Sequence, residues 1–154
     1  MNWIFVAFFI ATVFHIAEEY IYPGGFKTFM KRVNPRVAPW VTMPCVVVIN
    51  GLQLALCIAV ILVGRNNLTF SMSLAGLLFL NSLMHIGGCI RVKGYAPGVI
   101  TGILLYLPLS LFAYFYFGST GQLSLIEGVM SIGLGLLFQA IPLAYFAISN
   151  FIRR

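Results

Sequence analysis

Acidic residues are scarce in this sequence: only three of its 154 residues are Asp or Glu, and charged residues of both signs make up 8%. Hydrophobic residues make up 61%, and the mean hydropathy is +1.02. A chain with so little charge is outside the usual range for a soluble globular domain. The composition therefore excludes that class and indicates an integral membrane protein whose surroundings are the lipid bilayer.

Cysteine is also scarce, and the three cysteines lack the close C-x-x-C spacing of a thiolate metal site. We interpret Cys45, Cys57 and Cys89 as small packing residues within apolar segments. The opening segment has no basic stretch before its apolar run, so we do not expect a cleaved signal peptide. No soluble domain, low-complexity tract or internal repeat is apparent, and one bundle accounts for residues 1–154.

Apolar segments long enough to cross the ~30 Å hydrocarbon layer occur five times, since a spanning helix needs about 20 such residues. The sequence therefore predicts an all-α fold, a polytopic bundle of five transmembrane helices. A polar stretch with four cations separates the first two segments, and we expect a loop there. The expected helices cover about residues 2–20, 39–63, 69–92, 99–117 and 125–151.

The nine Lys and Arg residues are distributed unevenly between the two sides of such a bundle. All but one follow the first, third or fifth helix, and only Arg65 falls on the other side. The positive-inside rule then places the amino terminus outside and the carboxyl terminus in the cytoplasm. Anionic lipid headgroups explain the net charge of +6, so we expect no nucleic-acid partner.

Polar residues of two expected helices lie at matching depths. The stretch HIAEEY lies near the inner end of the first helix. At about 100° per residue, Glu18 and Glu19 fall within about 60° of His15 on either side, so all three project from one face. Asn81 and His85 are four residues apart on the third helix, which runs in the same direction. Polar groups in hydrocarbon are costly and usually turn inward and pair. We therefore expect both histidines and two of the three acids to meet in the cytoplasmic half of the bundle.

Two imidazoles with one or two carboxylates form a suitable ligand set for Zn, Fe or Mn. One glutamate would be a ligand and the other a catalytic acid or base. Which glutamate has which role is undecided, because both lie on the same helical face. The depth of Asn50 on the second helix suggests that Asn50 and Asn81 orient the ligands. The predicted metal ligands are His15, Glu18, Glu19 and His85.

A purely structural interpretation of these residues is also open. Near a helix end, Glu18 and Glu19 can reach headgroup water or pair with basic residues. The basic candidates are Lys27, Lys31 and Arg91. The two histidines can form hydrogen bonds between helices without sharing a site.

Three short motifs occur in order along the chain: HIAEEY at 15–20, NSLMH at 81–85 and GYAPGVITG at 94–102. Together they resemble the HXXEE family of small prokaryotic membrane proteins. The resemblance implies a multi-helix fold in a prokaryotic inner membrane and functional roles for the motif residues, and it supplies no reaction. Those residues are His15, Glu18, Glu19, Asn81, His85, Tyr95, Pro97, Gly98 and Thr101.

The third motif can also be interpreted from its residues alone. Pro97 and Gly98 favour a tight turn before a helix that Thr101 opens. Tyr95 and Thr101 could then present hydroxyl groups to a polar headgroup, with Arg91 near enough to bind phosphate. We expect Tyr95 to be catalytic and Arg91 and Thr101 to bind substrate, and the alternative is a simple turn at the membrane surface.

These predictions favour one function over two others. The preferred hypothesis is a metal-dependent integral membrane enzyme, a hydrolase with Zn or an oxidase with Fe, acting on a lipid or isoprenoid-like amphiphile at the cytoplasmic side. The main alternative is a proton-coupled carrier or ligand-binding protein in which His15, Glu18 and Glu19 relay protons. Five helices without an inverted repeat count against a carrier that acts as a monomer, and a homodimer would remove that objection. The third hypothesis is an assembly partner in a larger membrane complex.

Overall fold

The computed structural model describes residues 3–21 and 25–152, and it is helical over most of that length. Four stretches of the described chain are long and apolar enough to cross a membrane. One of them, Met43–Val92, contains two long helices joined by a 3-10 turn at Gly64–Asn67. The predicted all-helical membrane fold with five long helices is therefore confirmed.

The long helices follow the predicted bounds closely. The largest difference is at the second span, which was expected to begin at residue 39 and begins at Met43, because a 3-10 turn (Ala38–Trp40) precedes it. Thr42 caps this helix by accepting a hydrogen bond from the Cys45 N–H at 3.4 Å. Four of the long helices are α1 (Trp3–Ile21), α3 (Met43–Val63), α4 (Leu68–Val92) and α7 (Leu125–Ile152). The other is a continuous run that consists of α5 (Val99–Thr101), a π-helical turn (Gly102–Tyr106) and α6 (Leu107–Ser119).

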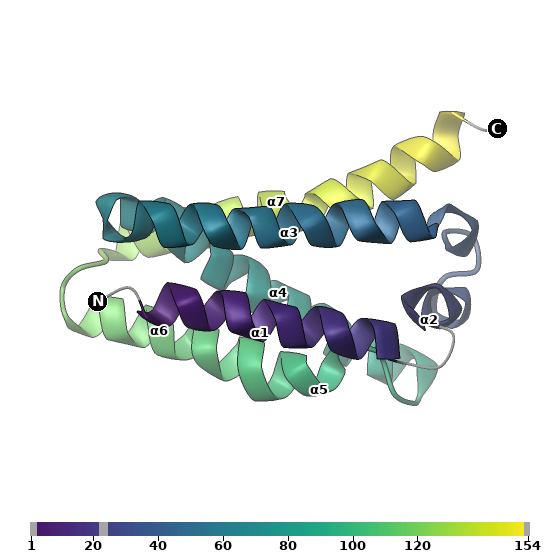
Figure 1. Cartoon of the computed structure of the whole chain (residues 1–154), viewed down its shortest axis with the longest axis horizontal. Coiled ribbons are helices and arrows are strands. Elements are labelled where there is room, and N and C mark those ends of the chain that lie inside the picture. The colour runs from purple at the N-terminus through teal and green to yellow at the C-terminus, as the bar shows by residue number, and fades with distance from the viewer. Residues whose placement is uncertain (1–2, 22–24, 153–154) are drawn as a thin grey trace.

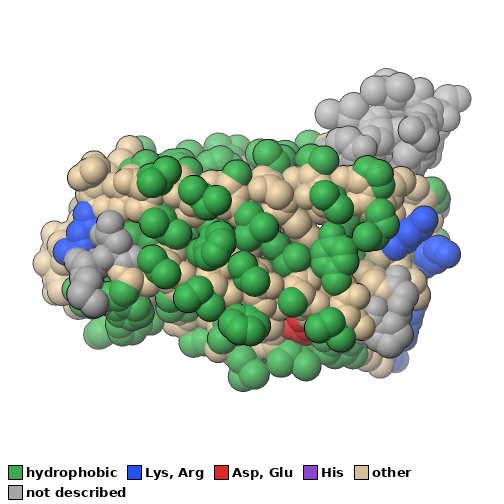
Figure 2. Space-filling model, viewed as in Figure 1, with side chains coloured by type: hydrophobic (Ala, Val, Ile, Leu, Met, Phe, Trp, Pro, Cys, Tyr) green, Lys and Arg blue, Asp and Glu red, His purple; other side chains and the backbone are tan. Residues whose placement is uncertain are grey.

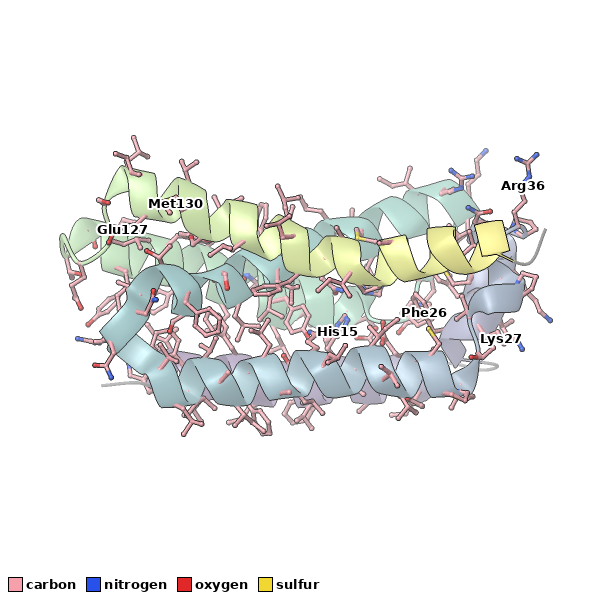
Figure 3. All side chains as sticks on the ribbon, turned by 90° about the horizontal axis from the view of Figure 1, so that it is seen from above. His15, Phe26, Lys27, Arg36, Glu127 and Met130 are labelled. Carbon is pink, nitrogen blue, oxygen red and sulfur yellow. The ribbon has the colours of Figure 1, made fainter. Side chains whose placement is uncertain are left out.

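A short helix, α2 (Gly25–Val33), lies within the polar stretch that was expected to be a loop. Its apolar residues Phe26, Phe29 and Met30 are three and four apart and share one face, while Lys27 and Lys31 are exposed. Such an amphipathic helix suits the membrane interface. Figures 1 and 3 show α2 closing the end of the bundle at which α1 ends and α3 begins.

The centre of the bundle is α4, which contacts every other long helix. Its segment 71–78 is entirely buried. The closest approach is to α7: an added Cβ at Gly135 would lie 2.6 Å from the Leu77 backbone nitrogen and 2.8 Å from the Gly76 carbonyl carbon. Small residues at such contacts let two helix backbones pack directly against each other.

The outer surface has the character expected of a protein in a bilayer. Figure 2 shows hydrophobic side chains spread over the visible face, with Lys and Arg gathered at its two ends. Large apolar side chains such as Leu62 and Phe115 are 77% and 73% exposed. Exposing so much apolar surface to water would be unfavourable, so these helices are suited to contact with lipid.

Candidate metal centre

Three side chains of metal-ligand type converge inside the bundle: His15 and Glu19 from α1, and His85 from α4. Their ligand atoms all lie within 4.8 Å of one another. His15 is 2% exposed, His85 6% and Glu19 9%. His15 and Glu19 meet because residues four apart are neighbours on a helix surface. Figure 3 shows His15 among the helices, on the side of the bundle towards Phe26 and Lys27.

The spacing of these atoms suits a shared ion better than direct hydrogen bonds. Glu19 Oε1 lies 3.5 Å from His85 Nε2 and 3.7 Å from His15 Nε2. Both distances exceed the usual range for an N–H···O bond. Ligand atoms around a tetrahedral ion with bonds of 2.0–2.1 Å lie about 3.3 Å apart. This buried group could hold a metal ion, which would also compensate the carboxylate charge.

Glu18 is turned away from the imidazole nitrogens that face Glu19, towards the loop after α4. Its Oε1 accepts hydrogen bonds from the Tyr95 hydroxyl at 2.5 Å and the Ile100 N–H at 3.1 Å. Its Oε2 accepts from the Thr101 N–H at 2.7 Å and the Thr101 hydroxyl at 2.5 Å. Glu18 therefore satisfies free amides at the positive end of the helical run that starts at Val99. The structure thus separates the two glutamates.

Thr101 connects Glu18 to His15. Its hydroxyl donates to the Glu18 carboxylate, which can only accept, so the Thr101 oxygen accepts from His15 Nδ1 at 2.9 Å. This arrangement places the proton of neutral His15 on Nδ1 and leaves the Nε2 lone pair facing Glu19. His15 Nε2 is buried and has no hydrogen-bond partner within the described chain.

His85 presents its Nε2 to the same carboxylate, and the Pro97 backbone carbonyl lies close to its ring. Histidines that bind metals usually donate their other ring N–H to a carbonyl or carboxylate. Both imidazoles are therefore oriented with Nε2 towards one carboxylate oxygen.

Gly98 lies directly against both imidazoles. Its φ is +88°, and an added Cβ would lie 2.6 Å from His15 Cε1 and 2.8 Å from His85 Cε1. Both the positive φ and the lack of space require glycine here. The loop that contains Pro97 and Gly98 therefore closes one side of the site, in addition to making the turn that the sequence predicts.

Tyr106 is a part of the site that the sequence analysis did not select. Its buried ring stacks on His15 with centroids 4.4 Å apart, and its hydroxyl accepts from Gln53 Nε2 at 3.0 Å. In an α-helix Tyr106 would lie about 140° round from Thr101. The π-helical turn Gly102–Tyr106 has i to i+5 spacing, so both residues meet His15. The available signal was the lone hydroxyl of Tyr106 in the apolar stretch GILLYLPL.

The two predicted orienting amides lie close to the three converging residues. Asn50 on α3 interacts with the Glu19 carboxyl, and its buried amide nitrogen finds no partner at hydrogen-bond distance among the described residues. Asn81 lies one turn before His85, and its buried Oδ1 is likewise without a partner in the described part of the chain. Both amides therefore have capacity for a further hydrogen bond.

Arg91 lies outside the site. Its Nε donates to the Val33 carbonyl at 2.9 Å, which joins the end of α4 to the end of α2. Within the described residues, neither Glu18 nor Glu19 forms an ion pair with Lys or Arg. The structural interpretation based on such pairs therefore finds no support in this part of the chain.

A hollow of about 320 Å³ reaches Glu19 from the end of the bundle that α2 covers. Its polar lining includes Lys27 and Tyr20, and Phe26 and Met43 contribute apolar surface. This hollow gives the carboxylate a path to the membrane interface, where water and lipid headgroups are both present.

Comparison with known sequences adds a family to this description. Residues 6–113 match the sequence model of a family described as "Protein of unknown function with HXXEE motif". The match covers most of the chain and includes all three motif segments. No curated protein and no solved structure matches the chain.

Proposed function

We propose that this chain, which belongs to the HXXEE family, is a metal-dependent integral membrane enzyme that acts on a lipid-like amphiphile. The observation that carries the proposal is the orientation of His15 and His85, which both present Nε2 to Glu19 Oε1 in a buried position. Separate structural roles would not need this common direction. The distribution of basic residues favours an orientation with the site at the cytoplasmic side, and we propose a prokaryotic inner membrane as its location.

The ligand set limits the choice of metal. Two imidazoles and one carboxylate, with positions left for water or substrate, suit catalytic Zn or non-haem Fe, and Mn fits less specifically. A divalent ion held there supplies a Lewis acid and activates water at neutral pH. Zn would make the protein a hydrolase, and Fe would make it an oxidase.

The chain's own residues have distinct roles in this proposal. Glu19 would hold the metal together with the two histidines, and its carboxylate, which lies near Asn50, could also accept a proton. Glu18 acts through Thr101, which fixes the tautomer of His15. Tyr95 is a positioning residue, because its hydroxyl donates to Glu18 and does not face the imidazoles' Nε2 atoms.

The direct test is metal analysis of protein purified in lipid nanodiscs after loading with Zn, Fe or Mn. Wild-type protein should hold about one equivalent of one metal, and His15→Ala and His85→Ala should each lose it. Glu127→Gln is the matched control, because this exposed carboxyl caps α7 by bonding to Ser124 and lies at the other end of the molecule (Figure 3). A metal-free wild type would contradict the proposal and favour a proton relay at the same residues.

Activity is tested separately. Metal-loaded wild-type protein in vesicles of mixed natural lipids should change the lipid profile seen by mass spectrometry, and Glu19→Gln should not. A change of equal size with Glu19→Gln would show that the chemistry does not use this site.

A further inference from the structure

A second hollow lies between α3, α4 and α7 and has a volume of about 230 Å³. Most of its lining is apolar, including Leu56, Phe138 and Pro142. Three amide side chains also line it, one from each helix, and none of the lining residues is charged. The amides are Gln53, Asn81 and Gln139.

Two of these amides are poorly satisfied. Asn81 Oδ1 is buried without a partner in the described chain, and Gln139 Nε2 contacts only the weakly accepting Met84 sulfur, at 3.1 Å, in the same part of the chain. Unsatisfied polar groups at membrane depth are costly. A ligand that offers both a hydrogen-bond donor and an acceptor would satisfy Asn81 and Gln139 together.

The hollow is connected to the metal centre through neighbouring side chains on α3 and α4. Gln53 donates to the Tyr106 hydroxyl, and Tyr106 stacks on His15. Asn81 precedes His85 by one turn of α4. On α3, the lining residues Ile49 and Leu52 lie close in sequence to Asn50, which is near Glu19. None of the three metal-ligand residues lines the hollow, so a molecule in it would be separated from them by side chains such as Tyr106.

We propose that this hollow binds an uncharged single-chain alcohol, with its hydroxyl at Asn81 and Gln139 and its chain against the apolar wall. A hydroxyl both donates to Asn81 Oδ1 and accepts from the Gln139 amide. A carboxylate head is excluded because no cation lines the hollow to offset its burial. A two-chain lipid would not fit inside the hollow, since 230 Å³ is below the usual 300–1,000 Å³ of sites for drug-sized ligands. Resting on the proposed function, this inference names the class of amphiphile that the enzyme binds: the alcohol would be the substrate of an oxidase and the alcohol product of an ester hydrolase.

Photolabelling in nanodiscs tests the site without depending on metal. Metal-free protein is irradiated with dodecanol, dodecane or dodecanoate, each carrying a terminal diazirine, and labelled peptides are identified by mass spectrometry. Dodecanol should label α3, α4 and α7 about fivefold more than the other two probes, as loss of one net hydrogen bond predicts. Excess unlabelled dodecanol should compete. Equal labelling by all three probes would overturn the proposal.

Substitutions test whether the amide side chains cause the preference for dodecanol over dodecane. Asn81→Leu and Gln139→Leu should each remove the preference for dodecanol over dodecane, and Leu56→Trp, which fills the hollow, should block labelling by every probe. Gln122→Leu is the matched control, because Gln122 bonds to Thr120 in an exposed loop. Unchanged preference in both amide variants would contradict the site.

The two proposals fail differently in these experiments. If wild-type protein binds metal but shows no preference for dodecanol, the alcohol site is wrong and the metal centre stands. If it prefers dodecanol but binds no metal, the alcohol site is supported and the proposed enzyme is wrong.

Discussion

Glu18 and Glu19 are neighbours in the chain, but their carboxylates serve different partners. Glu19 Oε1 faces two imidazole nitrogens at 3.5 and 3.7 Å, whereas Glu18 accepts four hydrogen bonds from Tyr95, Ile100 and Thr101. The two adjacent glutamates therefore differ in role: Glu19 faces the candidate metal centre, and Glu18 binds the loop that closes it.

The first prediction separates the two glutamates. Glu19→Gln removes a charged ligand and should weaken metal binding more than about 100-fold, whereas Glu18→Gln keeps all three ligands and should weaken it by about 10- to 100-fold, as for other groups that orient ligands. Competition with a metal chelator measures both affinities. Equal losses in the two variants would mean that the glutamates do not have separate roles.

The second prediction concerns the Thr101 hydroxyl. Thr101→Val removes the acceptor of His15 Nδ1, so metal affinity should fall at least about tenfold. Thr101→Ser keeps the hydroxyl and should restore affinity to near the wild-type value. Loss of affinity in both variants would indicate a packing role for the methyl group instead.

The third prediction concerns Gly98. Gly98→Ala places a methyl group within 3 Å of both imidazoles and should displace them and abolish metal binding. Gly87→Ala is the matched control, because a Cβ there meets nothing within 4 Å. Retention of metal by Gly98→Ala would show that the loop does not lie against the histidines.

The fourth prediction concerns stability apart from the site. Gly135→Ala sets a Cβ against the α4 backbone, and overpacking of this kind costs about 1–3 kcal/mol. Its thermal midpoint should therefore fall by several degrees, as about 2–4 °C per kcal/mol implies for a chain of this size. Gly133→Ala, where a Cβ has open space, should leave the midpoint unchanged. The light-scattering midpoint of heated nanodiscs measures the difference.

Hydropathy was sufficient to predict the long helices, because the requirement to cross the bilayer determines their length and composition. Helical spacing predicted that His15, Glu18, Glu19 and His85 would converge, and the structure brings His15, Glu19 and His85 together. The amphipathic α2 was missed because its cations and the glycine at its start are typical of a loop. The spacing of Phe26, Phe29 and Met30, three and four residues apart, does fit a helix.

Finer features of the site depend on packing that spacing alone does not contain. Glu18 and Glu19 differ by about 100° round α1, which is enough to send one carboxylate to α4 and the other to the loop at 95–101. Tyr106 was missed because the π-helical turn changes the residue spacing. The hydrogen bond from Arg91 Nε to the Val33 carbonyl was not predicted, and substrate binding by Arg91 stays a prediction.

The π-helical turn accommodates one additional residue without moving the tyrosine away from the site. If one residue between Thr101 and Tyr106 were deleted and the helix became an ordinary one, the tyrosine would follow Thr101 by four residues, about 40° round the axis, and would still face His15. If the present residues formed an ordinary helix, the tyrosine would lie about 140° round and would leave His15 while every ligand stayed in the chain. A one-codon deletion in this turn would therefore preserve the surroundings of the centre, whereas the same deletion in an ordinary stretch of the helix would rotate all that follows.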